Sequence, residues 1–104
     1  MHIATVVGNV WATKKESTLE GVRLLVVQPF TADGGMAAET MVAADTIGAG
    51  IGERVLVVHG RAARHLIGKG HDVGFQTAVA GIVDRMQLAD GRSFGTTAEH
   101  DTES

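Results

Sequence analysis

The sequence predicts a small, mainly β protein in which five short strands close, or nearly close, into a barrel. Short runs rich in β-branched residues recur along the 104-residue chain, separated by turn-forming clusters. Glycine supplies 14 of the 104 residues, against a usual share of about 7%. Only one short segment has a helical composition. The length indicates a single domain.

The first two strands are predicted from their apolar content. "IATVVGNVWA" (residues 3–12) is rich in β-branched residues, and Gly8 inside it indicates a bulge or a tight bend. "VRLLVVQPF" (residues 22–30) is almost entirely apolar, which predicts a strand buried along most of its length. Pro29 marks the point at which that strand loses a backbone donor.

The remaining elements follow from the same signals. "MVAADTIGAG" (41–50) and "GERVLVVHG" (52–60) predict the third and fourth strands, and "TAVAGIVDRMQL" (77–88) predicts the fifth. "RAARHLI" (61–67) predicts a helix of two turns at most. We divide the chain into a barrel domain, residues 1–88, and a polar tail, residues 89–104, which is either disordered or docked outside the core.

The composition argues against several functions. The net charge is −3 with the histidines neutral, and aromatic residues make up 4%, so neither a basic groove nor stacking rings for nucleic acid are expected. Cysteine is absent, which leaves no thiolate chemistry. The amino-terminal residues lack the basic region of a signal peptide, and no apolar run reaches the ~20 residues of a membrane span.

"GAGIGE" (residues 48–53) superficially resembles a phosphate-binding loop. A dinucleotide site needs a wider glycine spacing and a following helix, whereas here a strand follows. The segment therefore predicts a hairpin turn, or a place where another backbone comes close. We expect Gly50 to adopt a positive φ, which a β-branched substitute would not readily take.

The spacing of the histidines, acids and serines does not indicate a metal site or acid–base catalysis. No two histidines stand at an HxH or HxxxH spacing, so no metal site and no cofactor are predicted, and solvated histidines are the simpler interpretation. No pair of acids has a spacing that enforces shared chemistry, and no serine lies in a nucleophile elbow. The histidines are His2, His59, His65, His71 and His100.

Several ordered segments together resemble one family. "VVGNVWATKK", "LEGVRLLVVQP", "AADTIGAGIGERVLVVHG" and "AVAGIVD" are similar to the vertex proteins of bacterial microcompartments, the EutN/CcmL family of ethanolamine-utilisation and carboxysome shells. The resemblance covers about residues 3–84. It implies a barrel similar to the oligonucleotide-binding (OB) fold, homopentamers at the five-fold corners of a shell in the bacterial cytoplasm, hexameric shell proteins as neighbours, and no enzymatic activity.

The resemblance also implies where two surfaces lie. It places the "GAGxGE" segment at the ring interface, with Glu53 reaching a neighbouring subunit: Gly48, Ala49, Gly50, Gly52 and Glu53. It places the residues after the "VVxG" strand near the five-fold axis: Gly60, Arg61, Ala62, Ala63 and Arg64. Two small hydroxyl residues are common after that glycine in the family, whereas Arg61 and Ala62 stand here.

Two alternatives to a shell protein stay open at this point. One is a small barrel that binds single-stranded nucleic acid, and the other is a small enzyme whose site forms between subunits.

Overall fold

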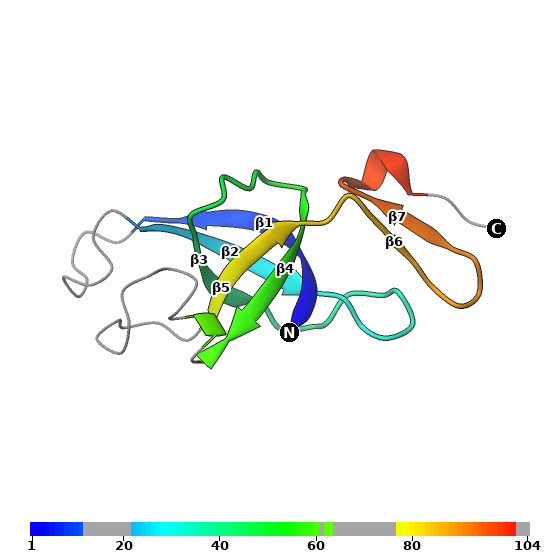
Figure 1. The fold of residues 1–104 in the computed structure, drawn as a ribbon, viewed down its shortest axis with the longest axis horizontal. Helices are drawn as coiled ribbons and strands as arrows, with labels where there is room; N and C mark the ends of the chain where they lie inside the picture. The colour runs from blue at the N-terminus through cyan, green and yellow to red at the C-terminus, as the bar shows by residue number, and fades with distance from the viewer. Residues whose placement is uncertain (12–21, 61, 64–76, 102–104) are drawn as a thin grey trace.

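The computed structural model describes residues 1–11, 22–60, 62–63 and 77–101. Five strands form a closed barrel in the order β1-β2-β3-β5-β4, and β4 pairs back onto β1 (Figure 1). The predicted fold class, an all-β, OB-like barrel, is therefore confirmed. The strands are β1 (His2–Val10), β2 (Arg23–Pro29), β3 (Met41–Asp45), β4 (Arg54–His59) and β5 (Thr77–Ile82).

All neighbouring barrel strands are antiparallel except β3 and β5, which run parallel and share one paired position, Ala44 with Ala78. The bulge predicted at Gly8 is confirmed. The register of β1 against β2 shifts between Val6 and Gly8, which leaves Val7 as the extra residue.

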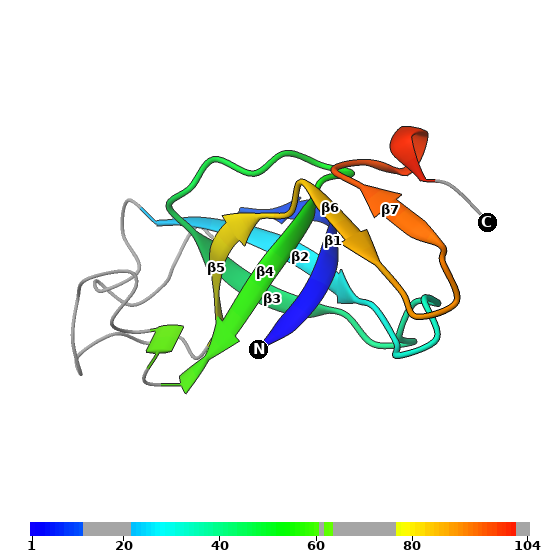
Figure 2. The same cartoon turned by 45° about the vertical axis from the view of Figure 1, so that its right-hand side comes forward.

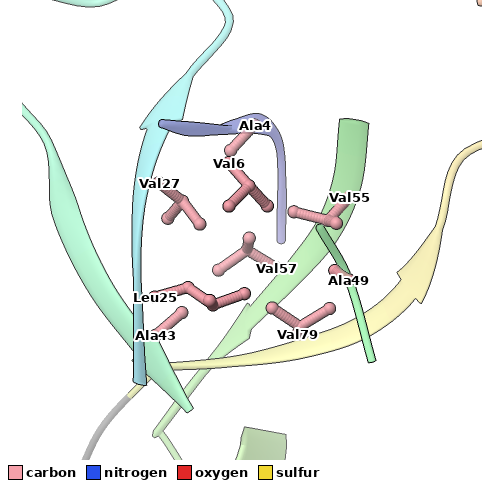
Figure 3. Close-up of a cluster of buried hydrophobic side chains, with 9 residues drawn as sticks. All are labelled: Ala4, Val6, Leu25, Val27, Ala43, Ala49, Val55, Val57 and Val79. Atoms are coloured by element: carbon pink, nitrogen blue, oxygen red, sulfur yellow. The ribbon is translucent and has the colours of Figure 1, made fainter. Parts of the chain in front are cut away.

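Small and medium apolar side chains fill the inside of the barrel (Figure 3). They alternate along the strands, as in Ala4 and Val6 or Val55 and Val57, because successive side chains point to opposite faces of a sheet. Nine fully buried residues form this cluster: Ala4, Val6, Leu25, Val27, Ala43, Ala49, Val55, Val57 and Val79.

A second apolar cluster joins β3, β4 and β5 away from that interior. It explains why β4 and the second predicted strand are apolar on both faces. Most of the helix predicted at residues 61–67 falls outside the described residues. The cluster consists of Val22, Ala44, Val58, Ala63 and Ala78.

Three predicted strand boundaries are wrong. The third strand ends at Asp45 rather than at residue 50, because the Asp45 side chain binds the backbone amides that follow it. The fourth begins at Arg54 rather than at residue 52, since Gly52 has a φ of 91°. The fifth does not continue to residue 88 but ends at Ile82, before a bend at Asp84.

After this bend the chain forms a two-stranded hairpin, β6 (Arg85–Gln87) with β7 (Ser93–Gly95), followed by a 3-10 helix, η3 (Ala98–His100). The hairpin and η3 lie to one side of the barrel (Figures 1 and 2). The predicted division after residue 88 falls between the two strands of this hairpin. In the part of the chain that the structure describes, no helix is long and apolar enough to cross a membrane.

Candidate assembly surface

The connection from β3 to β4, residues 46–53, contains the segment predicted to contact a neighbouring subunit. The Asp45 carboxylate anchors it. This side chain is fully buried and accepts hydrogen bonds from the amides of Ile47 (2.9 Å), Gly48 (3.2 Å) and Ala49 (3.0 Å). An aspartate at the end of a strand can form this arrangement because its short side chain reaches the next backbone amides. The start of the loop is thus fixed by its own chain.

Arg23 on β2 ties this loop to two other strands. Its Nη1 lies 3.3 Å from Asp45 Oδ2 and donates to the carbonyl oxygen of Ala49 at 2.6 Å. Its Nη2 donates to Asn9 Oδ1 on β1 at 3.1 Å. The Arg23 side chain is 45% exposed, so water screens the ion pair, and the hydrogen bonds mainly fix the position of the loop.

Two glycines give the rest of the loop its backbone conformation, but Gly50, the glycine expected to have a positive φ, is not one of them. Gly48 and Gly52 have φ values of 99° and 91°, whereas Gly50 does not have a positive φ, so that prediction is wrong. The Gly52 amide donates to the Val6 carbonyl at 2.7 Å, and the Val6 amide donates to the Glu53 carbonyl at 2.9 Å. The end of the loop is therefore held against β1 beside the bulge.

The Glu53 side chain accepts a hydrogen bond from the Gly50 amide of its own chain. A Cβ atom built on Gly50 would lie 3.3 Å from Glu53 Oε1. Glycine at this position thus lets the carboxylate close onto the loop. A contact between Glu53 and a neighbouring subunit stays a prediction.

The loop held by these hydrogen bonds buries the side chain of Ala49 and exposes those of Ile47 and Ile51. Ala49 is fully buried in the barrel interior, whereas Ile47 and Ile51 are 47% and 62% exposed. Two branched apolar side chains on a loop held by hydrogen bonds form a small surface that another protein can cover.

A second apolar surface lies on the outside of the barrel. Val42 on β3 pairs with Val26 on β2, which pairs with Gly8 on β1. Val42 is 52% exposed, and Val7, the bulged residue beside Gly8, is 43% exposed. The strands β1, β2 and β3 therefore present apolar side chains to solvent.

The structure describes three of the five residues predicted near a five-fold axis. Gly60 has a φ of 61°, Ala62 is exposed, and Ala63 is fully buried in the second apolar cluster. Arg61 and Arg64 lie outside the described residues. Gly60 directly follows the end of β4, so the three described residues, Gly60, Ala62 and Ala63, lie near one end of that strand.

Sequence reasoning missed a contact between two histidines. Nδ1 of His2 lies 2.7 Å from Nε2 of His59, and Nδ1 of His59 lies 3.2 Å from Thr77 Oγ1. Burial lowers the pKa of His59 from its usual 6.5, and the charges of His2 and the Met1 amino group lower it further. The spacing rules find only pairs that are close in sequence, whereas these residues meet because β1 pairs with β4.

Arg54 at the start of β4 holds the carboxy-terminal segment. Its amide donates to the Thr96 carbonyl at 2.8 Å, and its guanidinium donates to the Gly95 carbonyl at 3.1 Å. The guanidinium also lies over the rings of Phe30 and Phe94, at 5.4 and 6.0 Å. The rings of Phe30 and Phe94 contact each other edge to face. Because they pack against each other and against Arg54, they do not form an open platform on which bases could stack.

The described residues include no group of three or more His, Cys, Asp or Glu side chains arranged to hold a metal ion. The Asp45 and Glu53 side chains bind backbone amides of their own loop. The clearest candidate for a functional surface among the described residues is therefore the β3–β4 loop, which hydrogen bonds hold in place and which exposes Ile47 and Ile51.

The fold and this surface define a small OB-like barrel protein. The chain belongs to the EutN/CcmL family, since the family model described as "Ethanolamine utilisation protein EutN/carboxysome" matches residues 1–84. The resemblance found in the sequence is thereby confirmed. The match ends at the bend before β6, so the hairpin and η3 lie outside it.

Individual relatives agree with this assignment. The carboxysome shell vertex protein CcmL of Thermosynechococcus vestitus is 50% identical over 84 residues, which are 81% of this chain and 84% of that protein. The structure of CcmL from Nostoc sp. PCC 7120 has a TM-score of 0.77 and 40% identity, covering 86% of this chain and 94% of that one. GrpN, the pentameric microcompartment shell protein of Rhodospirillum rubrum, has a TM-score of 0.72 and 39% identity, covering 81% and 94%.

Proposed function

We propose that this chain is a structural protein, not an enzyme, and that five copies form a ring at the vertex of a bacterial microcompartment shell in the cytoplasm. Membership of the EutN/CcmL family carries the proposal, because its relatives are named as shell vertex proteins and one solved relative as pentameric. Flat layers of hexagonal units cannot close into a polyhedron without units of five-fold symmetry. Hexameric shell proteins are accordingly the expected neighbours, and no cofactor is required.

We infer the position of the ring interface from the two apolar surfaces. A ring with cyclic symmetry joins one patch on each copy to a different patch on the next. The loop with Ile47 and Ile51 is one patch, and the outer face with Val7 and Val42 is its proposed partner. In this arrangement Gly48, Ala49, Gly50, Gly52 and Glu53 lie at the interface, and Gly60, Arg61, Ala62, Ala63 and Arg64 lie near the axis.

Native mass spectrometry of the full chain tests this proposal. The expected species is a pentamer at micromolar concentration. Ile51→Asp should convert it to smaller species, because burying an unpaired carboxylate in an interface is strongly unfavourable. Met36→Asp is a matched control: Met36 is also exposed, at 42%, but lies in the connection from β2 to β3.

A monomer, dimer or hexamer as the dominant wild-type species would contradict the ring. A pentamer that tolerates Ile51→Asp as well as Met36→Asp would leave the ring standing and place the interface elsewhere. Far-UV circular dichroism of both variants shows whether the barrel itself remains folded.

A further inference from the structure

The His2–His59 contact is built by the closure of the barrel. In the β1–β4 ladder His2 stands opposite Val57, so His59, two residues further on, is its diagonal neighbour on the same face. The two rings are 4.8 Å apart and nearly perpendicular, at 87°. Two imidazoles that are 57 positions apart in the chain thus present one nitrogen each to a common point.

The separation of the two nitrogens limits what can lie between them. At 2.7 Å one nitrogen must donate and the other accept, because two lone pairs or two N–H groups would repel. The pair therefore holds a single proton in this region. A metal ion can take the place of this hydrogen bond when the proton between the nitrogens is released to water and both lone pairs turn toward the ion, since neutral imidazole is a ligand for transition metals.

Thr77 on β5 orients the His59 ring. Its hydroxyl oxygen lies 3.2 Å from Nδ1, the nitrogen that does not face His2. Histidines that bind metals are commonly held by such a hydrogen bond at their second nitrogen, which fixes the tautomer and the direction of the other lone pair.

We propose that Nδ1 of His2 and Nε2 of His59 bind one divalent transition-metal ion, and that Cu²⁺ binds most tightly. Neighbouring ligand atoms with metal bonds of about 2.0 Å are about 2.8 Å apart in a square-planar site and about 3.3 Å apart in a tetrahedral one. The two nitrogens already lie 2.7 Å apart, so they need to separate only slightly to bind one ion. The preference for Cu²⁺ rests on the general affinity order of nitrogen donors, in which Cu²⁺ stands highest.

The chemistry of the site also predicts which ions it rejects. Within the described residues no third His, Cys, Asp or Glu joins the pair, so the remaining coordination positions fall to water or to the nearby Met1 amine. Mg²⁺ and Ca²⁺ prefer oxygen ligands and should not bind. The expected order follows the general trend for nitrogen donors, Cu²⁺ before Ni²⁺ and Zn²⁺. This site does not depend on the ring proposed above.

Isothermal titration of the full chain with Cu²⁺, Ni²⁺, Zn²⁺ and Mg²⁺ tests the site. One Cu²⁺ per chain is expected. His2→Gln and His59→Gln should each weaken Cu²⁺ binding at least tenfold, and Thr77→Val by about tenfold through loss of the orienting bond. The matched control is the triple variant His65→Gln, His71→Gln, His100→Gln, which keeps both proposed ligands and should bind as the wild type does.

His2 is exposed at the start of β1, so its replacement should leave the barrel folded, which circular dichroism checks. Nitrogen coupling in the electron paramagnetic resonance spectrum of the Cu²⁺ complex should show two imidazoles and lose one in His2→Gln. Wild-type affinity in the His2 or His59 variant, or loss of binding in the triple control, would overturn the site. Unchanged affinity in Thr77→Val would overturn the orienting role of β5.

Discussion

The two guanidinium nitrogens of Arg54 lie 2.6 and 2.8 Å from the two carboxylate oxygens of Asp101, 47 positions further along the chain. This two-point ion pair connects the first residue of β4 to the segment that follows η3. The side chains of Arg54 and Asp101 are 8% and 28% exposed, so the pair lies largely out of water. Asp101 Oδ1 also accepts from the Gly95 amide, which brings the end of β7 into the same contact.

Asp101→Ala should lower the free energy of unfolding by about 1.5–3 kcal/mol, since it leaves the buried guanidinium without its charged acceptor. Urea denaturation at a fixed protein concentration measures the change. Asp90→Ala is the control, because the Arg92–Asp90 pair is 33% and 54% exposed, and a clearly smaller loss is expected there. Equal losses in the two variants would show that the Arg54–Asp101 pair adds nothing beyond a surface contact.

Gly52→Ala should destabilise the chain by about 1–2 kcal/mol through backbone strain alone. Gly52 has a φ of 91°, yet a Cβ atom at this position would meet nothing within 4 Å. Gly81→Ala is the control that separates backbone strain from the effect of adding a Cβ atom. Gly81 has the same open space without a positive φ, so alanine there should be neutral or stabilise by up to about 1 kcal/mol. Thermal unfolding of both variants measures the difference, and similar melting temperatures would contradict it.

The His59 imidazole should make stability depend on pH in mildly acidic solution. Its folded pKa lies below the usual 6.5, so between these two values the unfolded chain binds more protons than the folded one. Stability from this group is complete above 6.5, falls as the pH decreases, and levels off below the folded pKa. His2 on β1, Thr77 on β5 and the Met1 amine are the described groups that act on this ring.

His59→Gln should flatten this dependence, as measured by urea midpoints between about pH 7.5 and pH 5. Asp33 and Asp90 also have lowered pKa values, but hydrogen bonds of these carboxylates cause those shifts from a usual 3.8, so their effect falls at more acidic pH. A slope that persists in His59→Gln would assign the effect to another group.

The barrel was predictable because its strands carry their own signal. Largely apolar runs such as residues 22–27 need burial, and turn-forming residues separate them. The presence of each barrel strand could therefore be predicted directly from the sequence. The errors lie at the ends of the strands, where hydrogen bonds of individual side chains determine the last residue of the strand. Asp45 ends β3 by binding the amides after it, and a pattern of apolar residues does not contain this competition.

The carboxy-terminal hairpin was missed for a different reason. Its strands have three residues each, too few for a periodic pattern, although Asp90–Gly91 is a turn signal and Gly91 has a φ of 95°. The segment gains its place from Arg54, a contact that depends on the completed barrel. The His2–His59 pair was equally inaccessible, because only the order of the strands reveals that the two residues meet.

The parallel pairing of β3 with β5 gives the barrel one weak seam. Its one paired position, Ala44 with Ala78, is backed by small side chains, whereas the other four strand pairs have ladders of four or more positions. Separating this seam would leave an open, wholly antiparallel sheet in the order β3-β2-β1-β4-β5. Backbone amides along the seam should therefore exchange with solvent hydrogen earlier than those of the β1–β2 ladder, and the seam should be the last part of the barrel to form during folding.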